Sequence, residues 1–374
     1  MTTEAIADRI REAARAEVAL RIAAGGNWLS AGHPVTAPTT LSLAADRGIV
    51  EYVPGDLTLT ARAGTPIAEL FAAVKANDQW LPLDPWGSDG GTLGATLSTA
   101  TAGPHSHAMG LPRDVALGVE FVSGTGEVIR AGGRVVKNVA GFDLTRLVIG
   151  AWGTLGVITE VTLRLRARPA VLRTLLLGVE TQARTLNSWA VDLRRLPFTP
   201  IASELVNGEL ARRLDLGGRP TCIIRIAGNA NSVNAQLAAL RRLGPISDAP
   251  DGVWQRLREC DRGAQATWRH SQAPSAFGDT WNGVEKATSE VDGALLHGNP
   301  LRGVVRAAAR GDVGALRRAV QAAVGTRAIE MLPADAFALH DDPVRMSTAR
   351  LEGRIRKTFD PKGILNPGIM GRDT

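Results

Sequence analysis

Three glycine-rich segments interrupt the first 160 residues, at 24–29, 87–94 and 150–156. Each follows an expected strand or precedes an expected helix, and backbone N–H groups in such loops can bind phosphate oxygens. Turn formation alone would explain any single loop, but three in one region favour a binding role. The chain contains neither GxGxxG opening a helix after a strand nor GxxxxGK[ST]. Neither a Rossmann domain nor a P-loop is therefore predicted, and a different dinucleotide fold is needed.

The length and composition are those of a globular protein with two domains. The chain has 374 residues, of which 44% are apolar and 21% charged, and domains average roughly 100–200 residues. It has two cysteines, Cys222 and Cys260, too far apart in sequence for a CxxC pair. These exclude a disulfide framework, a four-thiolate zinc site and a four-cysteine iron–sulfur cluster held by this chain alone.

The formal net charge is +6, and only five of the 43 basic residues are lysine. The arginines are scattered and there is a single Tyr, whereas nucleic-acid binders cluster basic residues with aromatic ones. Two explanations of the high arginine content remain open: a compositional bias, or a basic surface that attracts an anionic substrate or partner. No signal peptide or membrane span is visible. We therefore expect a cytoplasmic protein, with peripheral association to the inner membrane through a partner left open.

Apolar periodicity predicts helices and strands that change in character at Pro169. In the first part we expect helices at 3–17, 66–76 and 143–149, and strands at 18–22, 40–44, 49–53, 57–62, 116–123, 127–130 and 157–166. After Pro169, strands at 171–180, 201–206 and 221–228 alternate with helices at 181–195, 230–243 and 313–324, which indicates a separate α+β domain. A helix at 344–357 precedes an irregular tail. The predicted domains are 1–169, 170–340 and 341–374.

Five motifs occur in a fixed order: Ala24-Gly25-Gly26-Asn27-Trp28, GTLGATLST at 91–99, GLPRD at 110–114, VKNVAGFDL at 136–144 and GTLGVI at 153–158. Together they resemble the FAD-binding domain of the vanillyl-alcohol oxidase and p-cresol methylhydroxylase (PCMH) type. KNVAGFDL and the tail FDPKGILNPG are most similar to the FAD-binding subunits of bacterial glycolate oxidases. The resemblance implies an α+β fold: an FAD-binding domain of two α/β subdomains, then a smaller α+β cap domain, with the tail returning to the FAD domain.

The resemblance implies non-covalent FAD, because the first loop, GGNWL, lacks the His to which some relatives attach FAD. No metal site is expected. Glycine N–H groups at 25–26 and 90–94, with that of Asn27, would meet the diphosphate, and hydroxyls of Thr92, Ser98 and Thr99 would meet polar edges. The expected cofactor residues are Gly25, Gly26, Asn27, Trp28, Gly90, Gly91, Thr92, Leu93, Gly94, Ser98, Thr99, Gly103, Arg113, Asp114, Gly153, Gly156, Val157 and Ile158. A valine at Gly94 or Gly156 is expected to block FAD with modest loss of stability. His105 and His107 are expected at the surface or beside the flavin.

A 2-hydroxy-acid oxidase needs a cation for the carboxylate and a base near the carbinol. Arg269 and His297 are the catalytic candidates; an ion-paired arginine and a packed loop histidine are the alternatives. The resemblance implies oxidation of glycolate to glyoxylate, with electrons passed to an iron–sulfur subunit, and a larger FAD-containing subunit as a second partner. A non-catalytic, flavin-carrying relay or scaffold subunit remains open, because no His cluster follows residue 169. A stand-alone sugar or lactone oxidase of the same FAD fold is a third alternative.

Overall fold

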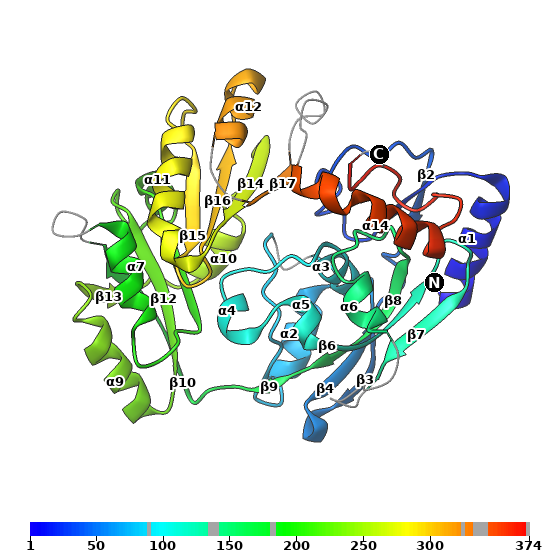
Figure 1. Cartoon of the computed structure of the whole chain (residues 1–374). Coiled ribbons are helices and arrows are strands. Elements are labelled where there is room, and N and C mark those ends of the chain that lie inside the picture. Colours follow the sequence, from blue (N-terminus) through cyan, green and yellow to red (C-terminus); the bar gives the residue numbers. More distant parts are fainter. Residues whose placement is uncertain (88–90, 134–141, 180–184, 323–325, 332–342, 372–374) are drawn as a thin grey trace. The chain divides into compact units, whose positions relative to one another are not determined.

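The computed structural model describes residues 1–87, 91–133, 142–179, 185–322, 326–331 and 343–371 (Figure 1). The chain divides into two units. Unit 1 comprises Met1–Ala102, Gly110–Arg168 and Asp341–Thr374, and unit 2 comprises Gly103–Met109 and Pro169–His340. The expected domain boundaries fall beside these limits, but the assignment of 103–109 to unit 2 was not expected.

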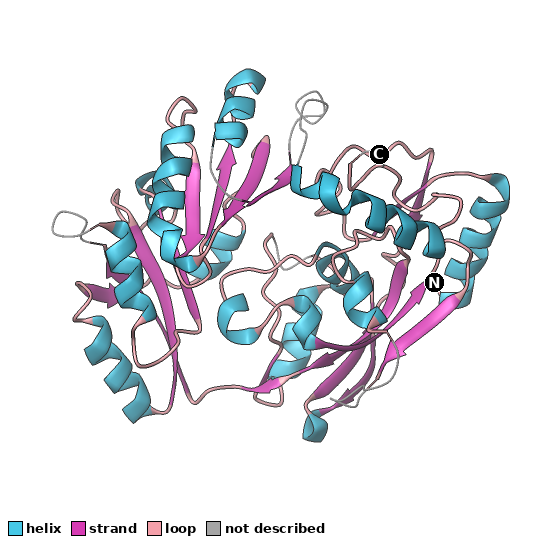
Figure 2. Ribbon diagram, viewed as in Figure 1, coloured by secondary structure: helices cyan, strands magenta, loops and turns pink. Residues whose placement is uncertain are grey.

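An antiparallel five-stranded sheet in the order β3-β4-β8-β6-β7 forms the centre of unit 1 (Figure 2). Its strands are β3 (Ile49–Val53), β4 (Thr58–Arg62), β6 (Ala116–Val122), β7 (Val128–Gly132) and β8 (Val157–Arg164). Alternation along β4 sends Leu59 and Ala61 to a buried apolar face. Thr60 points the other way and its hydroxyl meets that of Thr162 on β8, so the second face is polar.

Helices α2 (Ile67–Lys75) and α3 (Leu93–Thr99) pack on the apolar face of this sheet. Leu70 of α2 and Leu93 and Leu97 of α3 are fully buried among the strand side chains. The hydroxyl of Thr92 accepts the N–H of Ala95 and caps α3. Burial of these two leucines and the Thr92 cap therefore stabilise a helix in a segment that otherwise contains small residues.

A second core in unit 1 joins the two ends of the chain. It contains α1 (Thr3–Ala16) and the parallel pair β1 (Leu20–Ala23) and β2 (Thr39–Ser42), together with Ile364 and Leu365 of the tail. The N–H of Leu20 donates to the carbonyl of Ile364 over 2.7 Å, and the N–H of Asn366 donates back to Leu20 over 2.9 Å. The tail therefore lies beside β1.

The remaining elements of unit 1 are the 3-10 helix η1 (Pro54–Asp56), α5 (Pro112–Val115), α6 (Leu144–Val148), α14 (Pro343–Phe359) and the paired short strands β5 (Gln79–Trp80) and β9 (Arg166–Ala167).

Arg62, at the end of β4, lies at the centre of an ionic network on the polar face of the sheet. Its Nε donates to Asp46 over 2.8 Å, and Nη2 donates to the hydroxyl of Thr3 on α1 over 2.8 Å. Nη1 lies 3.5 Å from Glu120 and 3.3 Å from Glu160. The network ties α1 to the sheet through one guanidinium.

Unit 2 contains an antiparallel eight-stranded sheet in the order β13-β10-β12-β11-β15-β16-β14-β17. Its strands are β10 (Val171–Gly178), β11 (Ala202–Val206), β12 (Thr221–Gly228), β13 (Ile246–Asp248), β14 (Ala266–Ser271), β15 (Leu295–Asn299), β16 (Val304–Ala309) and β17 (Thr326–Met331). Its helices are α4 (Ser106–Met109), α7 (Leu186–Arg194), α8 (Gly208–Arg213), α9 (Ala230–Leu240), α10 (Val253–Arg258), η2 (Pro274–Ala276), α11 (Phe277–Ala287) and α12 (Val313–Ala322). Helices α7, α9, α11 and α12 cover one face of the sheet, where they form its apolar core.

The segment 103–109 is held within unit 2 by its two histidines. Nε2 of His105 accepts a hydrogen bond from Nη1 of Arg225 over 2.9 Å, and His105 is only 8% exposed. Nε2–H of His107 donates to the carbonyl of Pro200 over 2.6 Å, and Nδ1 accepts from Asn299 over 3.2 Å. Burial lowers the pKa of His107, which keeps the ring neutral. Of the two expected positions, exposed at the surface or beside the flavin, the exposed one is therefore wrong for His105.

Candidate functional site

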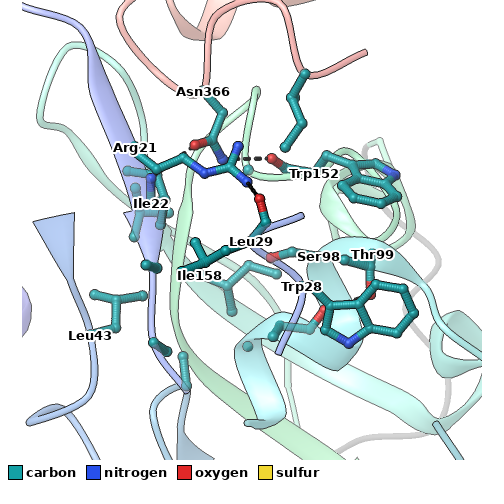
Figure 3. Close-up of a pocket in the computed structure, with 18 of the residues that line it drawn as sticks. Arg21, Ile22, Trp28, Leu29, Leu43, Ser98, Thr99, Trp152, Ile158 and Asn366 are labelled. Carbon is teal, nitrogen blue, oxygen red and sulfur yellow. Dashed lines mark hydrogen bonds between the residues drawn. The ribbon is translucent and has the colours of Figure 1, made fainter. Parts of the chain in front are cut away.

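Unit 1 contains a pocket that is partly open to solvent (Figure 3). Its walls come from β1 and the loop that follows, from α3, from the 150–156 loop with the start of β8, and from the tail. All three glycine-rich regions thus contribute residues to one cavity.

Ten of the expected cofactor residues line this pocket: Gly26, Asn27, Trp28, Gly94, Ser98, Thr99, Gly153, Gly156, Val157 and Ile158. They come from segments about 60 residues apart in sequence, which a common ligand would explain. Figure 3 shows Ser98 and Thr99 at the end of α3, near the indole of Trp28.

The other expected residues are not among those that line the pocket. Thr92 caps α3, Leu93 is buried in the core, and Gly103 belongs to unit 2. Asp114 of α5 accepts the N–H of Leu111. Gly25, Gly91 and Arg113 also lie outside the lining. Gly90, Lys137 and most of the KNVAGF run fall outside the described residues.

The second glycine-rich loop uses part of its N–H groups within the protein. The N–H of Leu93 donates to the carbonyl of Thr65 over 2.9 Å, and that of Gly94 donates to Ala63 over 2.7 Å. The expectation that the N–H of Gly94 meets the diphosphate is therefore wrong. Both N–H groups instead fix α3 against the end of β4.

The glycines at 94 and 156 are required by protein packing. A Cβ on Gly94 would lie 2.8 Å from the Cβ of Ala63, and one on Gly156 would lie 2.5 Å from Cδ2 of Phe121. Real Cβ atoms essentially never approach this closely. The expected modest loss of stability for a valine at either position therefore does not follow from the structure.

We expect Gly156→Ala to destabilise unit 1 by about 1–3 kcal/mol, because the methyl group overpacks the core against Phe121. Urea unfolding and FAD content, measured on the same samples, test this. Gly55→Ala is the matched control, since nothing lies within 4 Å of its added Cβ. Wild-type stability combined with loss of FAD would instead show that Gly156 contacts the cofactor.

Several pocket residues were not expected from the sequence: Arg21, Leu43, Ala63, Ala95, Trp152, Asn366 and Ile369. Asn366 joins three walls. Its Oδ1 accepts the N–H of Ile22 in β1, and its Nδ2 donates to the carbonyl of Trp152, each over 2.8 Å (Figure 3). The NPG motif indicated that the tail belongs with the FAD domain, but nothing in the sequence indicated which of its residues faces the pocket.

The lining suits a ligand with flat apolar parts and a negative charge. Trp28 and Trp152 supply aromatic surface, alanine, leucine and isoleucine side chains supply apolar walls, and Arg21 supplies a cation. The described lining residues include no acidic side chain. FAD, with its aromatic ring systems and diphosphate, fits this donor set. No His or Cys is among these lining residues either, so none of them offers a covalent attachment point.

The catalytic candidates of unit 2 lie on the sheet face opposite its helix-covered core. His297 of β15 and Arg269 of β14 are both cross-strand partners of Arg306 on β16. Arg306 is 3% exposed and pairs with Asp261 over 2.8 Å and Glu330 over 2.5 Å. Arg269 lies 4.0 Å from Glu330 and its side chain is 46% exposed. Arg269 therefore remains accessible, while the carboxylate nearest to it is bound mainly by Arg306.

His297 is enclosed. Its Nδ1–H donates to Oε1 of Glu204 over 2.7 Å, and its side chain is 1% exposed. Burial, with the nearby charge of Arg306, lowers its pKa well below the usual range. A lowered pKa makes the imidazole neutral and a weak proton acceptor.

Within the described ranges, no group of three or more His, Cys, Asp or Glu is arranged to hold a metal ion. No described helix is long and apolar enough to cross a membrane.

Comparison with known proteins places these features in context. Residues 1–132 match the FAD binding domain family. The chain is 28% identical to the glycolate oxidase subunit GlcE of Escherichia coli (strain K12) over 382 residues, which cover 98% of this chain and 97% of that protein. The glycolate oxidase subunit GlcD of Bacillus subtilis (strain 168) is 34% identical over 142 residues, 37% of this chain and 30% of that protein.

Among solved structures, 4-ethylphenol oxidase from Gulosibacter chungangensis aligns with a TM-score of 0.73 and 15% sequence identity, over 99% of this chain and 88% of that chain. At that identity the likeness concerns the fold alone. The predicted α+β, PCMH-type fold is confirmed, as is FAD as the cofactor.

Proposed function

The N-terminal region of this FAD-dependent oxidoreductase matches an FAD-binding domain. From this premise, we propose that the chain is the FAD-binding subunit of a 2-hydroxy-acid oxidase complex. In this proposal it oxidises glycolate to glyoxylate and passes the electrons to an iron–sulfur subunit, beside a larger FAD-containing subunit. The observation that carries the proposal is the similarity to the glycolate oxidase subunit GlcE, which extends over 98% of the chain. The pocket of unit 1 would hold FAD non-covalently.

Oxidation of a 2-hydroxy acid removes a hydride from the carbinol carbon and a proton from its hydroxyl. FAD, when bound, supplies the acceptor for the hydride. Arg269 is the proposed ligand of the substrate carboxylate, because its guanidinium is half-exposed and only weakly paired with Glu330. His297 remains the proposed base, held by Glu204 with Nδ1 protonated.

The first test is spectroscopic. We expect the purified chain to be yellow and to release intact FAD on acid precipitation. The isolated chain should show little or no steady-state oxidation of glycolate with an artificial acceptor. Co-expression with the larger flavoprotein and iron–sulfur subunits should restore turnover, in the range of about 1–10³ per second typical of enzymes. A protein without FAD, or one whose flavin remains attached to the denatured chain, would contradict the cofactor assignment.

A second candidate is an accessory subunit that carries flavin without oxidising the substrate. The 1% exposure of the His297 side chain and its lowered pKa favour it, because a buried weak base suits structure better than proton transfer. Arg269→Met in the assembled complex separates the two. A rise in KM for glycolate of tenfold or more supports catalysis at this chain. Unchanged kinetics, matching an Arg262→Met control on an exposed residue, support the accessory role.

A further inference from the structure

Arg21 is an unusual residue for its position in β1. Its side chain extends along the pocket, and Nη2 donates to the carbonyl of Leu29 over 2.9 Å (Figure 3). Its Nη1 is buried, and within the described structure it has no hydrogen-bond partner. A buried polar atom is normally paired, and a buried charged one is costly when it is not. A partner for Nη1 is therefore missing from the protein itself.

The surroundings of Arg21 do not neutralise its charge. Burial lowers the pKa of its guanidinium. The described residues that line the pocket carry no carboxylate. Arg62, by contrast, has its desolvation offset by Asp46, Glu160 and Glu120. The difference between these two partly buried arginines indicates that the counter-charge of Arg21 comes from a ligand.

The ligand must combine an anionic part with apolar surface. Arg21 faces a cavity whose other walls include Trp28, Trp152 and the backbone of the first glycine-rich loop. Guanidinium groups bind phosphate oxygens through paired, charge-assisted hydrogen bonds. The diphosphate of an adenine dinucleotide carries such oxygens beside a flat aromatic group.

We propose that Arg21 is a direct ligand of the FAD diphosphate. Its guanidinium would bind phosphate oxygens in addition to the backbone N–H groups that generally bind them in glycine-rich loops. This assignment rests on the proposed function, in which the pocket of unit 1 holds FAD. Leu29 then has a positioning role: its carbonyl holds one end of the guanidinium and leaves Nη1 for the ligand.

Titration of the apoprotein with ADP and with adenosine tests the assignment, because the two differ in the diphosphate alone. We expect Arg21→Gln to weaken ADP binding by about 10- to 100-fold, the equivalent of one charged hydrogen bond, and to leave adenosine binding unchanged. Arg21→Lys should retain part of the ADP affinity. Raising the salt concentration should weaken ADP binding to the wild type more than to Arg21→Gln.

Two results would overturn the assignment while leaving the proposed function intact. One is wild-type FAD and ADP affinity in Arg21→Gln. The other is an equal loss of ADP and adenosine binding in both Arg21→Gln and Arg21→Lys, which would show that Arg21 only holds the loop at Leu29. Failure of the wild-type apoprotein to bind FAD at all would instead contradict the proposed function, and this inference with it. Thermal unfolding of each apoprotein checks that the variants are folded.

Discussion

Arg62→Met should lower the free energy of unfolding of unit 1 by about 3–5 kcal/mol, the range found when one partner of a buried ion pair is removed. The substitution leaves Asp46 and Glu120, whose side chains are 2% and 8% exposed, without this cation. It also removes the hydrogen bond that connects β4 to Thr3 of α1. Urea unfolding followed by fluorescence would measure the loss, and the FAD content should fall with it.

Arg9→Met is the control, because Arg9 is 58% exposed and its contact with Glu12 is 3.8 Å long. Equal effects of the two substitutions would contradict a central role for Arg62.

The pH dependence of stability tests the contribution of Glu120 to the same ionic network. Burial would raise the pKa of Glu120, but hydrogen bonds from Thr3, Thr159 and Arg130 outweigh it and lower the pKa. The stabilisation is therefore present above the unfolded pKa of about 4.3. It is lost as pH falls through the folded value, so Glu120→Gln should flatten the acid side of the stability profile.

Asn366→Leu should remove most of the bound FAD and lower the stability of unit 1 by about 3–8 kcal/mol. The side chain is 4% exposed, and its loss would leave the Ile22 N–H and the Trp152 carbonyl unpaired, at about 1–3 kcal/mol each. The backbone at Asn366 has a φ of 44°, a left-handed conformation that costs leucine about 1–2 kcal/mol more. Flavin absorbance per protein and urea unfolding give the two readouts.

Asn366→Gly separates these contributions, since glycine adopts a positive φ freely but cannot form the two side-chain bonds. It should lose FAD nearly as completely as Asn366→Leu with a smaller loss of stability. Asn77→Leu, on the exposed surface of unit 1, serves as the control. Full FAD content in Asn366→Gly would mean that the amide does not shape the pocket.

The sequence predicted the elements whose apolar residues follow a clear period. The expected helix at 3–17 corresponds to α1 at Thr3–Ala16, and the expected strand at 57–62 to β4 at Thr58–Arg62. Helix α3 was not expected, because GTLGATLST contains two glycines and two leucines, and neither helical nor strand periodicity stands out. Its stability comes from burial of Leu93 and Leu97 against the sheet, which is tertiary information.

The candidate site was predictable as a set of segments more than as a set of side chains. Glycines mark where the backbone turns or packs closely, but the sequence does not say against what: at Gly156 it is Phe121. Arg21 lies in a short strand among more than thirty other arginines, so nothing in the sequence distinguishes it. Its lack of a carboxylate neighbour becomes visible only when the pocket walls are assembled.

The contact between Ile22 and Asn366 sets a limit on when this protein can acquire its cofactor in the cell. The two residues are 344 positions apart in the chain. At about 5–20 residues per second, the ribosome needs roughly 17–70 s to make the second after the first. Throughout that interval the nascent chain holds an incomplete pocket, open on the side that Asn366 and Ile369 later form. We therefore expect flavin loading to follow synthesis of the tail, so that a chain ending before Asn366 would lack bound flavin.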